Sequence, residues 1–181
     1  MIVFITGGVK NGKSSLAQEI ALKLADGKKH YYIATMIPSD EEDLERIRLH
    51  KEDRAGMEFE TIECGRNILT CLDQADKNAT FLLDSVTALF LNELFPDPMS
   101  CQMDEDASKR CAAQLETFVK TVKNAVIVSD FIYSDAIRYD DVTKKYREGL
   151  ALIDRTLAKA CDTVIEVVNS NLFVHKGEWV Q

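Results

Sequence analysis

Cysteine pairs in C-x-x-C spacing are absent from this sequence, and the five cysteines are odd in number. This pattern argues against a zinc site or a disulfide framework and favours reduced thiols in a cytoplasmic protein. Long apolar runs are also absent, because the apolar start 1–5 is far too short for a membrane span or a signal peptide. With no internal repeat or low-complexity linker, we expect one domain over 1–181, without a membrane span.

An excess of positive charge is missing as well. The formal net charge is −8, which argues against a nucleic-acid partner, since such proteins favour a basic face. The hydrophobic fraction of 46% and the charged fraction of 29% are ordinary for a globular protein. At 181 residues, the chain is long enough to bury a core without disulfides or metal.

Short apolar, β-branched segments alternate with amphipathic ones along the whole chain. Strands are expected at 2–6, 31–34, 59–63, 80–84, 125–129 and 163–168, and helices at 13–24, 40–54, 68–73, 86–94, 106–123 and 141–160. A C-terminal hairpin is expected at 172–180, turning at Lys176-Gly177. This alternation predicts an α/β fold with a mostly parallel sheet flanked by helices.

A glycine-rich segment follows the first strand and matches G-x-x-x-x-G-K-[ST]. Glycines let backbone N–H groups turn toward phosphate oxygens, and the start of the following helix adds partial positive charge. Lys13 is expected to reach the β- and γ-phosphates of a nucleoside triphosphate, and Ser14 to bind Mg²⁺. The predicted nucleotide-binding residues of this segment are Gly7, Gly8, Val9, Lys10, Asn11, Gly12, Lys13, Ser14 and Ser15.

Such a loop needs a carboxylate partner for Mg²⁺ at the end of an apolar strand. Asp84 follows Thr80-Phe-Leu-Leu83 and is the predicted second metal residue. A helix N-cap is the alternative role for Asp84, and Asp130, which also ends an apolar strand, is the competing metal residue.

One of the three histidines lies between two arginines. Arg46, His50 and Arg54 are spaced by four and would line one helix face. Arginines attract polyphosphate, and neighbouring cations favour the neutral imidazole, which is a competent nucleophile toward phosphorus. The alternative is a solvated helix whose acidic residues pair with the arginines.

Together these segments resemble the adenosylcobinamide kinase / adenosylcobinamide-phosphate guanylyltransferase family of cobalamin biosynthesis. The resemblance runs over most of the chain, and its most specific part is the combination of the glycine-rich loop with Ile33-Ala-Thr35 and the Arg-x-x-x-His-Lys-x-x-Arg segment. Further matching segments are Phe59-Glu-Thr-Ile-Glu63, Leu82-Leu-Asp84, Asn92-Glu-Leu-Phe95, Tyr146-Arg-Glu148 and Ala160-Cys-Asp-Thr-Val164.

The resemblance implies a RecA-like P-loop domain and two activities. ATP or GTP phosphorylates the side-chain hydroxyl of adenosylcobinamide, and His50 then accepts GMP from GTP and passes it to adenosylcobinamide phosphate. Catalytic roles are implied for His50 and Lys13, and Arg46, Arg54 and Glu63 are placed in the nucleotide site. A homotrimer is also implied.

The chain departs from the family pattern in two places. Where the family typically has Asn-Glu-Val-Gly, this chain has Asp130-Phe131-Ile132-Tyr133, and an Asn expected in the last helix is Asp154. Nucleotide preference and the survival of both activities therefore stay open. Three other functions also stay open: a P-loop kinase without histidine transfer, a nucleotide-switched binding module and a RecA-like ATPase subunit.

Overall fold

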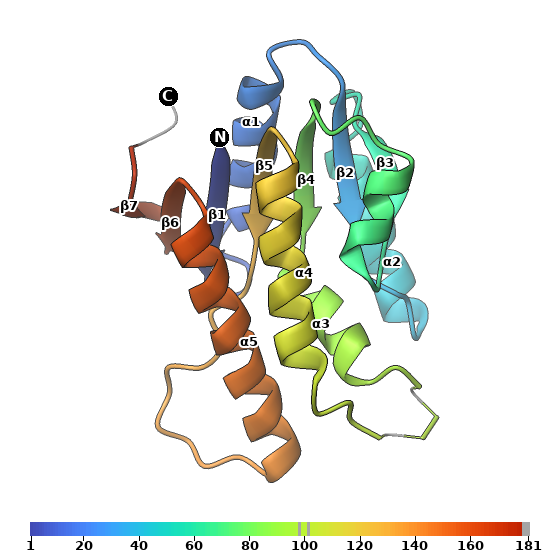
Figure 1. Cartoon of the computed structure of the whole chain (residues 1–181), viewed down its shortest axis with the longest axis vertical. Coiled ribbons are helices and arrows are strands. Elements are labelled where there is room, and N and C mark those ends of the chain that lie inside the picture. The colour runs from blue at the N-terminus through green and yellow to red at the C-terminus, as the bar shows by residue number, and fades with distance from the viewer. Residues whose placement is uncertain (98, 101, 179–181) are drawn as a thin grey trace.

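The computed structural model describes residues 1–97, 99–100 and 102–178. A seven-stranded sheet with the order β3-β2-β4-β5-β1-β6-β7 forms the centre of the molecule (Figure 1). Strands β1 to β6 are parallel, and β7 is antiparallel to β6. The strands are β1 Ile2–Gly7, β2 His30–Ala34, β3 Glu60–Glu63, β4 Thr80–Asp84, β5 Asn124–Val128, β6 Thr163–Val168 and β7 Asn171–Lys176.

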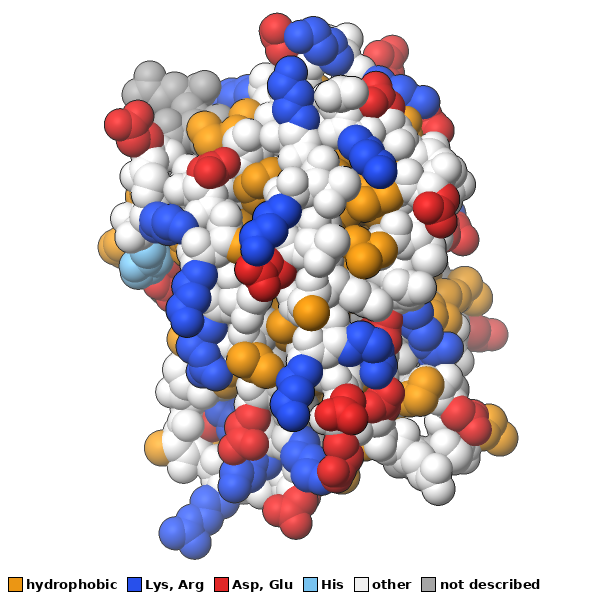
Figure 2. Space-filling view, viewed as in Figure 1, with side chains coloured by type: hydrophobic (Ala, Val, Ile, Leu, Met, Phe, Trp, Pro, Cys, Tyr) orange, Lys and Arg blue, Asp and Glu red, His pale blue; other side chains and the backbone are white. Residues whose placement is uncertain are grey.

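Helices cover both faces of this sheet. Helix α1 packs on one face against β1, β4 and β5, while α3, α4 and α5 form a layer on the other (Figure 1). On the solvent side of the α4–α5 layer, acidic and basic side chains are interspersed (Figure 2). The helices are α1 Lys13–Ala25, α2 Glu41–Asp53, the 3₁₀ helix η1 Ile68–Asp73, α3 Val86–Leu94, α4 Ala107–Thr121 and α5 Asp141–Ala160.

Apolar residues in the central strands point alternately into two cores, as the two-residue period of a strand requires. In β1, Val3 and Ile5 join the cluster beneath α1, whereas Phe4 joins the cluster beneath α3, α4 and α5. Because both faces are covered, these strands need apolar residues at every position. The unbroken apolar runs in the sequence have this physical origin.

The predicted α/β fold with a mostly parallel sheet is confirmed, and so is the antiparallel hairpin at its edge. The predicted position of the hairpin turn was wrong. Val168 pairs with Asn171, so the turn is Asn169-Ser170, and Lys176 lies at the end of the second strand. Both turn residues have positive φ, 47° and 63°, which suits a two-residue type I′ turn. Position 180 of the predicted hairpin lies outside the described residues.

The parallel strands bring their carboxyl ends to one edge of the sheet. Gly7, Ala34, Glu63, Asp84 and Val128 are the last residues of β1, β2, β3, β4 and β5. In open α/β sheets, ligands bind at this edge. The topology therefore gathers segments that are far apart in the chain around one site.

Candidate active site

The glycine-rich loop connects the end of β1 to the start of α1, as predicted from the sequence. Gly7 has φ 149°, and a Cβ built there would lie 2.3 Å from the carbonyl oxygen of Val167. Gly12 caps α1 with φ 84°, in the left-handed region that favours glycine. Asn11 closes the loop onto β6 by donating from Nδ2 to Val167 O at 3.5 Å. The loop thus depends on glycine for both close approach and backbone direction.

Lys13 is almost completely buried beneath this loop. Its Nζ donates to the carbonyl oxygen of Gly8 at 2.7 Å and pairs with Asp130 Oδ1 at 2.8 Å. Asp130 is held in turn by α3, because its backbone N–H donates to Thr87 Oγ1 at 2.9 Å. The ammonium group is therefore aimed along the loop and already has a carboxylate counter-ion.

Asp84 at the end of β4 lies beside Ser14, close enough for the serine hydroxyl to lower the pKa of the carboxyl group. Tyr32 donates to Asp84, with 3.3 Å between Tyr32 Oη and Asp84 Oδ2. The pKa of Asp84 is raised, chiefly by burial and also by the nearby charge of Asp130. Ser14, a positive charge on His50 and the Tyr32 hydroxyl act in the opposite direction. A partly buried carboxylate of this kind is stabilised when a cation approaches.

Helix α2 carries the predicted histidine. Its start follows from an N-cap, since the Asp40 side chain accepts a hydrogen bond from Asp43 N at 2.8 Å, and Glu41 and Glu42 lie in the first turn. His50 lies in the last turn, half-buried, close enough to Asp84 for its charge to act on that carboxylate.

The two arginines of the triad have different environments. Arg46 is exposed and pairs with Asp43 at 3.7 Å and Glu42 at 3.9 Å. Arg54 is the residue after the last turn of α2 and is only 8% exposed. Its guanidinium Cζ lies 3.5 Å from the centroid of the Tyr32 ring, and its Nη1 is buried without a hydrogen-bond partner among the described residues. Arg54 therefore belongs to the buried base of the site.

The remaining predicted residues surround this centre. Val9, Lys10 and Ser15 are exposed. Glu63 is exposed at the end of β3, in register with Ala34 of β2.

The sequence analysis did not predict the contact of Tyr32 with Asp84 or the contact of Thr35 with Ser85. Thr35 Oγ1 donates to Ser85 O at 2.7 Å and accepts from Ser85 N at 2.8 Å, which fixes the backbone directly after Asp84. A buried tyrosine needs a partner for its hydroxyl, and in a parallel sheet Tyr32 of β2 is two positions from the end of the strand. In the pairing of β2 with β4, Tyr32 lies beside Leu82 and Ala34 beside Asp84. This pairing brings Tyr32 close to Asp84, and it could not be read from the local sequence.

Oxygen donors at Ser14 and Asp84 fit Mg²⁺, which is held by one or two protein oxygens together with phosphate oxygens and water. Among the described residues, no group of three or more His, Cys, Asp or Glu side chains could hold a metal ion by itself.

The parallel sheet, its covered faces and the loop between β1 and α1 define a P-loop protein of RecA-like architecture. Solved structures that share this fold include three that each match 97% of this chain. A KaiC-like protein from Pyrococcus horikoshii is 16% identical with a TM-score of 0.57, covering 97% of this chain and 78% of that one. The flagellar accessory protein FlaH from Methanocaldococcus jannaschii is 16% identical with a TM-score of 0.53, with the same coverages. A third structure, an ATPase domain, is 12% identical with a TM-score of 0.56, covering 97% of this chain and 76% of that one.

The family model for cobinamide kinase / cobinamide phosphate guanyltransferase matches residues 3–172, nearly the whole sequence, and the chain belongs to this family. It is therefore a transferase of cobalamin biosynthesis that combines kinase and guanyltransferase activities and uses nucleoside triphosphates. No curated protein sequence matches significantly. Within the described part of the chain, no helix has both the length and the apolar character needed to cross a membrane.

Proposed function

We propose that the loop Gly7–Ser15 binds the triphosphate of ATP or GTP and that His50 carries GMP between GTP and adenosylcobinamide phosphate. The observation that carries this proposal is the convergence on Asp84. Ser14 of the loop lies beside this carboxyl group and lowers its pKa, and His50 of α2 lies near enough that a positive charge on its ring would lower the pKa further. A residue of the loop and the histidine thus both lie near one carboxyl group, which supports a nucleotide that is held at its phosphates and attacked by an imidazole.

In the kinase reaction, the hydroxyl oxygen of adenosylcobinamide attacks the γ-phosphorus. The bond from this phosphorus to the bridging oxygen breaks, the nucleoside diphosphate leaves and the hydroxyl proton passes to solvent. Lys13 and the loop amides hold the phosphates in line for this attack. Ser14 and Asp84 would hold Mg²⁺, which when bound neutralises charge on the phosphate oxygens. Asp130 is the counter-ion of Lys13 rather than a second partner of Ser14, which favours Asp84 as the metal residue.

In the guanylyl transfer, an imidazole nitrogen of His50 attacks the α-phosphorus of GTP. The bond between this phosphorus and the bridging oxygen breaks, and pyrophosphate leaves. A phosphate oxygen of adenosylcobinamide phosphate then attacks the same phosphorus, the phosphorus–nitrogen bond breaks, and the imidazole is regenerated. Arg46 and Arg54 would stabilise the departing pyrophosphate, and the unpartnered Nη1 of Arg54 supports that role. Glu63 completes the proposed nucleotide site from the end of β3.

The test uses GTP labelled at the α-phosphate, incubated with Mg²⁺ and the protein and then quenched. We expect acid-labile, base-stable label on the denatured wild-type chain and none on His50→Ala, which should keep phosphoryl transfer to adenosylcobinamide. His30→Gln is the matched control, because His30 lies at the opposite end of β2, where its ring bonds the carbonyl oxygens of Lys28 and Met57 at 2.8 Å. Label persisting in His50→Ala, or absent from an active wild-type kinase, would contradict the histidine step.

We further propose that 1–181 forms one catalytic domain and assembles as a homotrimer. All seven strands belong to one sheet, which supports the single domain. Exposed apolar side chains lie on α2, at Leu44 and Leu49, and on the edge strand β7, at Phe173, and such positions suit subunit contacts. Light scattering coupled to size-exclusion chromatography would measure the mass of the assembly. A monomer at micromolar concentration would contradict the trimer.

A further inference from the structure

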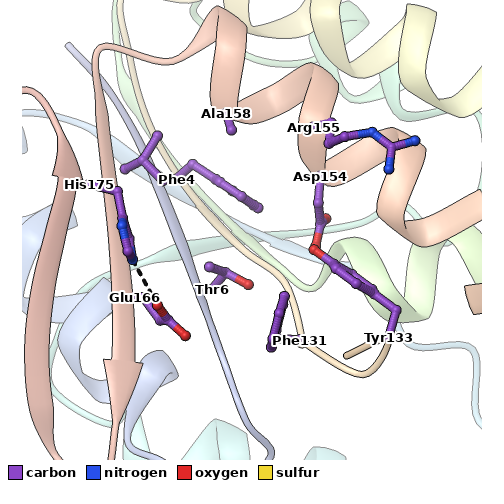
Figure 3. Close-up of a pocket in the computed structure, with 10 residues that line it drawn as sticks. Phe4, Thr6, Phe131, Tyr133, Asp154, Arg155, Ala158, Glu166 and His175 are labelled. Carbon is purple, nitrogen blue, oxygen red and sulfur yellow. Dashed lines mark hydrogen bonds and ion pairs between the residues drawn. The ribbon is translucent and has the colours of Figure 1, made fainter. Parts of the chain in front are cut away.

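A cavity of about 200 Å³ lies outside the nucleotide site, between α5 and the strands β1, β6 and β7 (Figure 3). The segment after β5 closes one side of it. Phe4, Phe131 and Tyr133 provide aromatic walls, and Thr6, Asp154 and Glu166 provide polar groups. The rings of Phe131 and Tyr133 meet edge to face, with 4.7 Å between their centroids.

Residues from separate parts of the chain converge on this cavity. Phe131 and Tyr133 come from the segment between β5 and α5, and Asp154 comes from the middle of α5, yet all three line the same space. They give the cavity two aromatic rings and one carboxylate, which is the chemistry that binds an organic cation.

Asp154 is the most buried polar residue lining the cavity, with 3% exposed. Its Oδ1 accepts from Ser129 Oγ at 2.8 Å, and its Oδ2 accepts from Tyr133 Oη at 3.0 Å. Each carboxylate oxygen offers two lone-pair directions, so both retain capacity for a further donor. The hydroxyl of Thr6 is also buried and has no hydrogen-bond partner among the described residues.

The other charged groups at the cavity do not neutralise Asp154. Glu166 pairs with His175, with 2.7 Å between Oε2 and Nε2. Arg155 follows Asp154 on α5, and its guanidinium points away from the cavity (Figure 3). An anion entering the cavity would meet two carboxylates, whereas a cation would meet a carboxylate, a hydroxyl and aromatic rings.

We propose that this cavity is a second ligand site, which takes a small organic cation consisting of a primary alkylammonium on an apolar stem. The ammonium donates to Asp154 and Thr6, and the stem lies against Phe4, Phe131 and Tyr133. Hydrogen bonds from a cation to a carboxylate are the strong ones, and aromatic faces attract ammonium groups when both are removed from water. The site requires neither His50 nor a metal, so its test is separate from that of the catalytic proposal.

The probe is n-butylammonium, compared with 1-butanol at equal ionic strength and pH 8. Binding is followed by NMR through the methyl signals of Thr6 and Ala158, which line the cavity. We expect saturable shifts with the amine and at least tenfold weaker binding of the alcohol. Asp154→Asn, which keeps the shape of the side chain and removes its charge, should reduce the affinity for the amine about tenfold and leave the affinity for the alcohol unchanged.

Glu148→Gln is the matched control, because it removes a carboxylate from α5 at an exposed pair with Lys144. Its affinity for the amine should equal that of the wild type. Phe131→Leu provides an independent check that leaves the Asp154 hydrogen bonds in place, and it should weaken amine binding severalfold. Equal binding of amine and alcohol, no saturable shift at these methyl groups, or unchanged affinity in Asp154→Asn would each overturn the proposal.

Discussion

The guanidinium of Arg54 covers the ring of Tyr32, with 3.5 Å from Cζ to the ring centroid, and the Tyr32 hydroxyl donates to Asp84. The phenol thus lies between a buried cation and a partly buried carboxylate. Burial and the charge of Asp84 raise the pKa of Tyr32, so the hydroxyl stays protonated and remains a donor. We infer that Tyr32 is a positioning residue for Asp84.

Replacing Tyr32 by Phe keeps the ring beneath Arg54 and removes only the hydrogen bond to Asp84. We expect the Mg²⁺ concentration for half-maximal phosphoryl transfer to rise roughly tenfold, since a hydrogen bond to a charged group contributes about 1.5–3 kcal/mol. The measurement is a Mg²⁺ titration of kinase activity. Tyr31→Phe is the control, because Tyr31 Oη accepts from Asp76 N at 3.1 Å, away from Asp84. Equal titrations for both variants would show that the hydroxyl is structural only.

Arg54→Lys retains the positive charge but loses the flat group that lies on Tyr32. If Arg54 contacts the triphosphate, KM for GTP should rise roughly tenfold, because Lys cannot reproduce the two-pronged geometry toward phosphate. Steady-state kinetics measure this. Arg48→Lys is the matched control, since Arg48 is an exposed α2 residue paired with Glu45 and Glu52 and should have no effect. A change in thermal stability alone, with unaltered KM, would make Arg54 a packing residue.

Asp84 is the last residue of β4 and Asp130 follows β5 by two residues, and their different contacts distinguish their roles. Asp84→Asn should lower Mg²⁺-dependent transfer by about a hundredfold or more, because the proposed metal residue is lost. Asp130→Asn removes the counter-ion of Lys13 and should leave the Mg²⁺ requirement unchanged while strengthening nucleotide binding. Calorimetric titration with GTP, with and without Mg²⁺, distinguishes the two. A raised Mg²⁺ requirement in Asp130→Asn alone would reverse the assignment.

Asp154 makes stability depend on pH in a direction opposite to most carboxylates. Burial raises its pKa to about 7, although Ser129 and Tyr133 donate to it. The folded state then holds a proton that the unfolded chain has lost, so this residue lowers stability as pH rises from about 4 to about 7. The free energy of unfolding of Asp154→Asn minus that of wild type should therefore increase by about 2–3 kcal/mol from pH 5 to pH 8.

Urea unfolding of both proteins at the two pH values measures that difference. Taking the difference between wild type and variant cancels the contribution of the other carboxylates to the pH dependence of stability. Several of these have lowered pKa values, as Asp135 and Asp140 do. A difference that stays constant from pH 5 to pH 8 would mean that Asp154 has the same proton occupancy folded and unfolded.

Local patterns were sufficient to predict most elements of the fold. The strand at Thr80–Asp84 and the helix capped by Asp40 follow from short-range apolar runs and a capping residue, and the structure confirms both. The edge turn at Asn169-Ser170 was missed because neither residue is glycine, although Asn tolerates positive φ. Its position is determined by pairing with β6, which is a long-range property.

The candidate site was only partly predictable for the same reason. The loop residues follow from a contiguous motif, whereas the contact between Tyr32 and Asp84 joins strands 52 positions apart. The burial of Arg54 likewise depends on Tyr32 beneath it and not on the helical spacing from His50. Spacing of four residues predicts a shared face of a helix, but Arg54 lies just beyond the last helical residue.

The pairing of Lys13 with Asp130 turns phosphate binding at this loop into an ion exchange. A phosphate oxygen that reaches the ammonium displaces a carboxylate already in place at 2.8 Å, instead of meeting an open positive charge. A lone sulfate or inorganic phosphate gains little from that substitution, because one anion replaces another. A triphosphate that also engages the loop amides and Arg54 gains contacts at several points. Asp130 would thus compete with incoming anions for Lys13, so that the loop binds polyphosphates in preference to the small anions abundant in a cell.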